Sequence, residues 1–246
     1  MSLKKNVIAN YLGNGWTALM SLAFIPYYLK YLGMEAYGLI GFYTMLQACL
    51  VLLDLGMTPT LSREMARFTG GQHTPQSIRD LLRSIEIICL IVGSAYMLVI
   101  WLSSGWVAAN WFQAEKLSRE SILEAYIIMG GVTALRFVEG IYRGAILGLQ
   151  KQVIFNLANA IMATLRGGGA VLILAFINPS IEAYFLWQGI VSGFTVMLFV
   201  KITYSSLPMA NRPGTFSIKE LNKVWLFASG VIITTFLALV LTQVDK

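Results

Sequence analysis

Charged residues are scarce in this sequence. Only 12% of its 246 residues are Asp, Glu, Lys or Arg, whereas soluble domains average about 25%. Hydrophobic residues make up 57% of the chain, and its mean hydropathy is +0.69. This balance excludes an ordinary water-soluble domain and predicts an integral membrane protein.

Histidine and cysteine are almost absent. His73 is the only histidine and lies in a polar loop, and Cys49 and Cys89 both lie in apolar runs. We therefore expect no histidine metal site, no histidine-based catalysis, no disulfide framework and no cofactor. Lys4 and Lys5 precede an apolar segment, as in a signal peptide, but this segment is too long and lacks a small-residue cleavage site. An uncleaved first membrane span is the prediction.

Hydrophobic stretches of about 20 residues recur along the chain, and this is the length that one membrane-spanning helix needs. The expected spans lie at residues 7–32, 36–59, 82–104, 122–148, 152–177, 181–204 and 223–243. The predicted fold is therefore all-α, a polytopic membrane helix bundle. A seventh span with no closing segment after it also suggests part of a longer protein.

The net charge of +6 comes from basic residues between the spans. No basic patch interleaved with aromatic residues occurs on a polar domain, so no nucleic acid partner is expected. Cytoplasmic segments of membrane proteins are rich in Lys and Arg. If the N-terminus is cytoplasmic, the outer segments hold only Lys30, Lys116 and Arg119, and the inner segments hold Lys4, Lys5, Arg63, Arg67, Arg79, Arg83, Lys151, Lys201, Arg212, Lys219 and Lys223. This asymmetry predicts a cytoplasmic N-terminus.

Two connections carry helix-start patterns. Thr74 followed by Pro75 combines a capping residue with proline at the first helical position, and predicts a short interfacial helix that leads into the third span. Ser217 and Glu220 form a capping-box pattern, which predicts that a new helix begins in the connection at 205–222.

Polar residues form a stripe along the first span. Asn6, Asn10 and Asn14 are spaced by four, and Thr17 and Ser21 extend the same slowly turning helix face. A lipid-facing helix would not keep such a stripe, so we expect it to face a bundle interior or a water-filled cavity. Hydrogen bonding between neighbouring helices is an alternative of equal weight.

Four charged residues lie inside two strongly apolar segments. Arg136, Glu139 and Arg143 belong to the fourth span, and Arg166 belongs to the fifth. An ionisable residue at membrane depth is a functional-site hypothesis, and structural ion pairing is its rival. Arg136 and Arg143 are about 20° apart around a helix, so they share a face.

Glycines accompany these charges. Gly140, Gly144 and Gly148 are spaced by four, and small residues at this spacing let a neighbouring helix approach closely. Three consecutive glycines follow Arg166 at positions 167–169, and they predict a bend or a very close neighbour beside the arginine.

The carboxylates allow two interpretations. Glu139 lies three and four residues from Arg136 and Arg143, and Asp54 lies near the inner end of the second span, where it could pair with an arginine of another span. Alternatively, either carboxylate could carry a coupling proton or sodium ion. Ion pairing is favoured for Glu139 because arginine is close. We expect Arg166 to face a cavity, and Arg143 to form a structural or gating pair with Glu139 or Asp54.

Several motifs resemble the polysaccharide transporter branch of the multidrug/oligosaccharidyl-lipid/polysaccharide exporter superfamily. They include RFVEGIYRGAILGLQKQVIFN, LRGGGA, the opening KKNVIANYLGNGWTALMSLAFIPYYLKYLG, LDLGMTPTLSREMAR and the closing TQVDK. The resemblance covers essentially the whole chain. This family consists of O-antigen and capsular polysaccharide flippases.

The resemblance implies a MATE-like fold, in which two six-helix lobes face each other across a central cavity. Residues 1–204 would form the first lobe, 205–222 a cytoplasmic linker, and 223–246 the seventh span that begins the second lobe. It implies a transporter, not an enzyme, in the bacterial cytoplasmic membrane. Its substrate would be a glycan on undecaprenyl diphosphate, moved to the outer leaflet by alternating access. Polysaccharide polymerase and assembly proteins would be its partners.

Arginines that line a wet cavity would hold the diphosphate of this substrate through charge-assisted hydrogen bonds. The expected substrate contacts are therefore Arg166, Arg136, Arg143, Asn10 and Asn14, with Glu139 and Asp54 in ion pairing or coupling. Two alternative functions stay open. A multidrug/cation antiporter of the same superfamily would use carboxylates for cations and would not need several arginines. A membrane-embedded glycan polymerase or transferase would need a sizeable catalytic loop, and the loops here are short.

Overall fold

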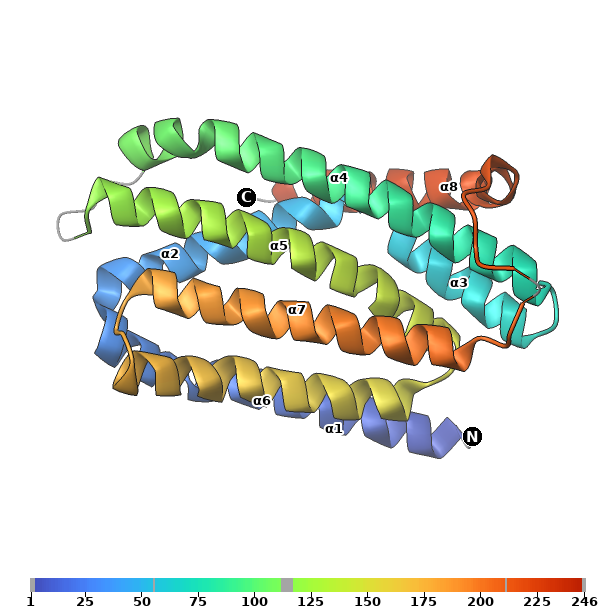
Figure 1. The fold of residues 1–246 in the computed structure, drawn as a ribbon, viewed down its shortest axis with the longest axis horizontal. Coiled ribbons are helices and arrows are strands. Elements are labelled where there is room, and N and C mark those ends of the chain that lie inside the picture. The colour runs from blue at the N-terminus through green and yellow to red at the C-terminus, as the bar shows by residue number, and fades with distance from the viewer. Residues whose placement is uncertain (1–2, 55, 112–116, 211, 245–246) are drawn as a thin grey trace.

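The computed structural model describes residues 3–54, 56–111, 117–210 and 212–244 as a bundle of α-helices (Figure 1). The helices are α1 (Leu3–Ala23), α2 (Ile25–Leu53), α3 (Met57–Thr69), α4 (Pro75–Asn110), α5 (Arg119–Gly148), α6 (Gln152–Phe176), α7 (Ile181–Ser206) and α8 (Ile218–Val244). No strand occurs within the described ranges, so the all-α prediction is confirmed. Lys116, residues 245–246 and the side chain of Cys49 lie outside the described part.

The predicted spans correspond closely to the helices, except for the first two spans. Within the described residues, α4 to α7 are each long and apolar enough to cross a membrane, and they match the spans predicted from 82 to 204. The span predicted at 7–32 is instead divided between α1 and the start of α2. The chain then turns back at Gly33, whose φ is 77°. Glycine adopts positive φ without a steric penalty, so Gly33 separates the first two spans.

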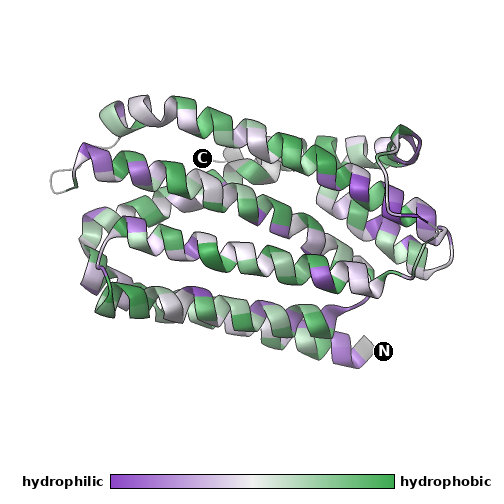
Figure 2. Cartoon of the chain, in the orientation of Figure 1, coloured by the Kyte–Doolittle hydropathy of each residue, from purple (hydrophilic) through white to green (hydrophobic). Residues whose placement is uncertain are grey.

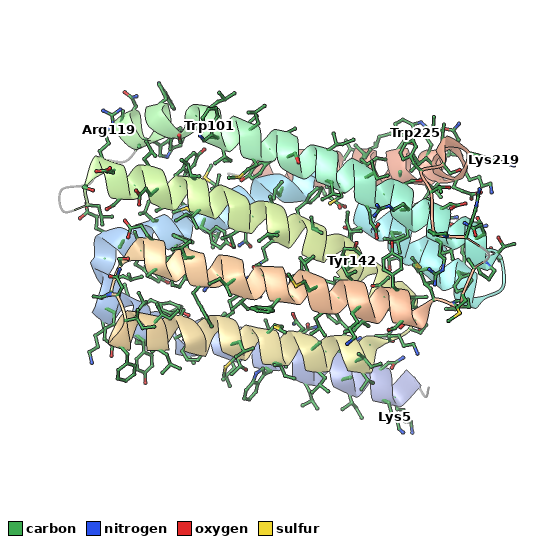
Figure 3. The ribbon with its side chains drawn as sticks, viewed as in Figure 1. Lys5, Trp101, Arg119, Tyr142, Lys219 and Trp225 are labelled. Carbon is green, nitrogen blue, oxygen red and sulfur yellow. The ribbon has the colours of Figure 1, made fainter. Side chains whose placement is uncertain are left out.

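Four helices form a layer in the order α4, α5, α7 and α6, and α8, α2 and α1 lie behind it (Figure 1). The N-terminus, α3 and the start of α8 share one end of the molecule. Hydrophilic residues gather at this end (Figure 2). Lys5 and Lys219 lie there, whereas Arg119 lies at the opposite end (Figure 3). We call it the basic end, because it carries the residues that the charge asymmetry predicts to be cytoplasmic.

The apolar core has two main clusters. One cluster, toward the basic end, includes Leu61 and Met65 of α3. The other includes Phe185 of α7 and the aromatic residues around it. On α5 this second cluster ends at Val132 and the first begins at Phe137, so that Arg136 lies at their boundary.

Helix α3 was not predicted, because residues 36–59 were expected to form one span and residues 60–81 a connection. α2 ends at Leu53, and the chain changes direction at Gly56, whose φ is 68°. α3 is amphipathic, since Leu61 and Met65 are fully buried while Arg67 is exposed on the other face.

The interfacial helix predicted at Thr74 is also corrected. The cap at Thr74 exists, but it begins α4, which runs unbroken from Pro75 to Asn110.

Two glycines on α5 allow α3 to pack directly against its backbone, which confirms the predicted close approach. A Cβ added at Gly144 would lie 2.8 Å from the carbonyl oxygen of Thr58, and one added at Gly148 would overlap the carbonyl oxygen of Ser62. Gly140 is different, because its added Cβ would lie 3.9 Å from Thr58 Oγ1, an ordinary contact.

These contacts predict that substitution by alanine has opposite effects at Gly148 and Gly140 of α5. Gly148→Ala is expected to lower the free energy of unfolding by about 1–3 kcal/mol, because the methyl group pushes α3 away from α5. Gly140→Ala has room and should be neutral or stabilising by up to about 1 kcal/mol through helix propensity. Thermal unfolding of both variants in the same detergent gives the comparison. Equal midpoints would contradict the packing.

The capping box predicted at the start of α8 is only half formed. The backbone N–H of Glu220 points to Ser217 Oγ at 3.4 Å, whereas the backbone N–H of Ser217 donates to Ser84 Oγ of α4 at 2.8 Å. The carboxylate of Glu220 instead accepts hydrogen bonds from Lys223 and from Ser77 of α4. Burial raises the pKa of Glu220, but hydrogen bonds from Lys223 and Ser77 outweigh it, so that the pKa is lowered.

A buried carboxylate on α4 also holds the linker that connects α7 to α8. Asp80 accepts a hydrogen bond of 2.8 Å from the backbone N–H of Thr215 and one of 2.9 Å from Gln76. It also pairs with Arg212 at 3.3 Å. The linker from α7 to α8 is therefore attached to the start of α4 at several points.

Candidate functional site

A cavity of about 730 Å³ opens between α2, α3, α5 and α8. Its α5 wall carries Arg136, Glu139 and Arg143, and Asp54 contributes from the end of α2. α8 closes part of the cavity with Val231, Ile232 and Thr235. The structure thus brings together four of the seven predicted site residues around one hollow.

One carboxylate in this wall is shared by two arginines. Glu139 lies 3.7 Å from Arg136 on the same helix and 3.3 Å from Arg166 of α6. The side chains of Glu139 and Arg166 are only 11% and 12% exposed, whereas that of Arg136 is 27% exposed and reaches the cavity. Ion pairing of Glu139 with arginine is therefore present, and it joins α5 to α6.

Arg166 lies behind Glu139, away from the cavity lining. Its Nη2 donates to Thr195 Oγ1 of α7 at 3.4 Å, and its backbone carbonyl accepts from Gln188 Nε2 at 3.4 Å. Its Nε is buried without a hydrogen-bond partner among the described residues. The expected cavity-facing position thus belongs to Arg136, and Arg166 supports the carboxylate from behind.

Two of the three glycines after Arg166 provide space for large neighbours, and the helix continues through them. An added Cβ at Gly167 would overlap the ring of Phe24, and one at Gly169 would overlap the indole of Trp187. α6 is continuous through all three positions. Of the two predictions for these glycines, the close neighbour is therefore the one that the structure bears out.

Arg143 does not form the ion pair that was predicted for it. Its guanidinium lies over the ring of Phe155, 5.6 Å from the centroid, and the described residues include no carboxylate within ion-pair distance of it. The side chain is exposed. Arg143 lacks a pair with Glu139 because this carboxylate is already held by two other arginines.

Asp54 does not pair with an arginine within the described part of the chain either. Its carboxylate accepts hydrogen bonds from the backbone N–H of Thr58 at 3.2 Å and from Thr58 Oγ1 at 2.7 Å. Asp54 therefore satisfies a backbone donor in the first turn of α3, where a negative charge is stabilised by the helix dipole.

The polar stripe of the first span joins helices and does not face the cavity. Asn10 Oδ1 accepts from Asn156 Nδ2 of α6 at 2.6 Å, and Thr17 Oγ1 accepts from Asn159 of the same helix at 3.2 Å. These residues join helices, as the alternative interpretation expects. Asn14 is exposed. None of these residues lines the cavity.

The family model described as "Polysaccharide biosynthesis protein" matches residues 3–246. The chain belongs to this family. It is the family of polysaccharide flippases that the sequence motifs resemble. Comparisons with curated proteins and with solved structures gave no match. Together with helices α4–α7, the family assigns this chain to multi-pass membrane proteins of polysaccharide biosynthesis.

This member of the polysaccharide biosynthesis family also contains a buried, hydrogen-bonded carboxylate that sequence reasoning missed. Glu86 of α4 is 5% exposed and accepts hydrogen bonds of 2.7 Å from both Tyr142 of α5 and Tyr204 of α7. Arg83 pairs with its other oxygen at 3.0 Å. One signal was available, since Glu86 lies within the apolar third span and three residues after an arginine.

A second missed carboxylate connects α3 to the start of α4. Glu64 is 1% exposed and lies 2.6 Å from His73 Nε2, with Arg63 and Arg67 also at its oxygens. His73 Nδ1 lies 3.3 Å from Ser77 Oγ. The sole histidine is therefore engaged in a contact that stabilises the basic end.

Proposed function

We propose that this chain forms part of a transporter that moves a lipid-linked glycan across the cytoplasmic membrane, and that the cavity receives the diphosphate of that lipid. The supporting observation is that the α5 wall presents two guanidinium groups to the cavity, one of which lacks a carboxylate partner among the described residues. Arg136 shares Glu139 with Arg166, and Arg143 has no carboxylate partner in the described ranges. Guanidinium groups bind phosphate oxygens in bidentate geometry, so a diphosphate complements this wall.

The contact between Arg136 and Glu139 supports the same proposal. It is long at 3.7 Å, whereas the side chain of Arg136 is 27% exposed and reaches the cavity. Charge-assisted hydrogen bonds to phosphate oxygens are shorter, about 2.7–2.9 Å, so a phosphate group would pair with this guanidinium more closely than Glu139 does. An organic cation would be repelled by it, which argues against the multidrug exporter alternative.

The remaining site residues receive different roles in this proposal. Arg166 is a positioning residue, because it holds Glu139 from behind through α6 and α7. Glu139 sets the distance between the two arginines, and Asp54 caps α3 at the rim of the cavity, where it remains the candidate for ion coupling. Asn10 and Asn14 belong to the α1 surface that packs on α6 or stays exposed.

The proposed architecture is the first lobe of a two-lobe alternating-access transporter. Residues 1–204 form this lobe, 205–222 the linker and 223–246 the start of the second lobe, with the N-terminus cytoplasmic. Val231, Ile232 and Thr235 of α8 line the cavity opposite the arginines of α5. A second-lobe helix at this place supports a cavity that lies between lobes.

Binding of the lipid-linked substrate tests the two cavity arginines. Arg136→Gln combined with Arg143→Gln is expected to weaken binding of an undecaprenyl-diphosphate-linked oligosaccharide by about 10- to 100-fold, because a hydrogen bond to a charged group contributes roughly 1.5–3 kcal/mol. The measurement is a titration of the protein in nanodiscs with a fluorescent form of this lipid.

The matched control is Arg119→Gln, which removes an exposed arginine at the opposite end of the molecule. Its affinity should equal that of the unchanged protein. Undecaprenyl diphosphate without a glycan should compete for the site if the diphosphate is what the arginines bind. Full affinity in the double variant would refute the proposal.

A further inference from the structure

An apolar groove lies between α6 and α7, apart from the cavity. It has a volume of about 510 Å³, within the ~300–1,000 Å³ of small-molecule sites. Its lining is apolar apart from one residue, Lys201 of α7. The groove shares neither a residue nor a helix with the cavity, which is lined by α2, α3, α5 and α8.

The groove has the length of a lipid chain and a positive charge at one end. From Trp187 to Lys201 along α7 the distance is about 21 Å at 1.5 Å per residue, which exceeds the ~15 Å depth of one leaflet, half of a hydrocarbon core of about 30 Å. Lys201 is exposed and lies in the part of α7 nearest the basic end. A lysine near a helix end extends its amine to the headgroup level.

We propose that this groove binds one acyl chain of an anionic phospholipid, whose phosphate pairs with Lys201. The apolar lining takes the chain, and the single lysine selects an anionic headgroup over a zwitterionic one. The tail of the transported lipid is a poorer occupant, because its diphosphate would lie in the cavity, on other helices. The binding site itself stands independently of the proposed transport function.

The groove lies directly behind the contacts that hold Arg166. Leu165, Trp187 and Phe194 line it. The next residue after Leu165 in the chain is Arg166 itself. The next residues after Trp187 and Phe194 are Gln188 and Thr195, which both form hydrogen bonds with Arg166.

Trp187 Nε1 also donates to the carbonyl of Leu165 at 2.9 Å, across the same helix pair. A bound chain therefore supports the spacing of α6 and α7 that places Arg166 against Glu139. This coupling of lipid to site rests on the proposed function.

Photo-crosslinking in nanodiscs tests the binding site. Phosphatidylglycerol with a diazirine on its acyl chain should label the α6 and α7 segments that line the groove more strongly than the matching phosphatidylcholine probe. Lys201→Gln should lower this preference about fivefold, since one lysine near an anionic surface contributes roughly 1 kcal/mol. Lys219→Gln is the matched control, because Lys219 is exposed at the same end but outside the groove.

A second variant pair tests the groove without changing its charge. Ile190→Trp should fill the groove and lower labelling by both probes, whereas Leu186→Trp, on an exposed position of the same helix outside the lining, should not. Equal labelling by the two probes, or labelling spread evenly over the lipid-facing surface, would overturn the proposal. The assay contains no glycan substrate, so its failure is distinguishable from failure of the transport proposal.

Discussion

Replacement of Glu139 by alanine is expected to destabilise the protein by about 3–5 kcal/mol, because it leaves a buried charge without its partner. Arg166 is 12% exposed, and Glu139 is its ion-pair partner in the described structure. The variant also leaves Arg136 facing Arg166 with no carboxylate between them. Such a loss corresponds to a fall of roughly 10 °C in the thermal unfolding midpoint of a chain of this size.

The same geometry predicts an asymmetry between the two partners. Arg166→Leu should be milder than Glu139→Ala, because Arg136 remains at 3.7 Å to compensate Glu139. The double variant with leucine at 139 and 166 should recover much of the loss, since a buried pair replaced by apolar residues is often neutral. Midpoints of the unchanged protein, Glu139→Leu, Arg166→Leu and this double variant in one detergent form a double-mutant cycle. A double variant as unstable as Glu139→Ala would contradict shared pairing.

Most of the fold follows from apolar length, and the exceptions have identifiable causes. The spans from α4 to α7 are predicted because each is a long apolar run between polar connections. Helix α3 is missed because its first residues fall at the end of the expected second span, and the remainder, with Arg63, Glu64 and Arg67, has the polarity of a connection. The change of direction depends on Gly56, and the conformation of a single glycine is not apparent from hydropathy.

The candidate site is predictable as a set of charges but not as an arrangement. The sequence indicates that Arg136, Glu139, Arg143 and Arg166 are unusual, because charge at membrane depth is unfavourable. It does not show which arginines pair with Glu139, since that depends on how α6 packs on α5. Gly167 and Gly169 let Phe24 and Trp187 approach α6, and this packing places Arg166 behind the carboxylate.

Glu86→Ala is expected to have the second large effect, a loss of about 2–5 kcal/mol in the free energy of unfolding. The substitution removes the acceptor of two tyrosine hydroxyls, Tyr142 and Tyr204, each 2.7 Å from the same oxygen. An unsatisfied buried hydroxyl is unfavourable by about 1–3 kcal/mol. Because these tyrosines come from α5 and α7, the packing of three helices should loosen together. The thermal unfolding midpoint in detergent, followed by intrinsic fluorescence, measures the effect.

Two further variants separate the hydroxyl groups from the charge. Arg83→Gln should change the stability by less than about 1 kcal/mol, since Arg83 is half exposed and its pair with Glu86 is screened by solvent. Phenylalanine at both tyrosine positions in the Glu86→Ala background should restore part of the loss, because it removes the donors that the alanine leaves unpaired. If that triple variant is less stable than Glu86→Ala alone, packing and not the hydrogen bonds holds α4, α5 and α7 together at this end.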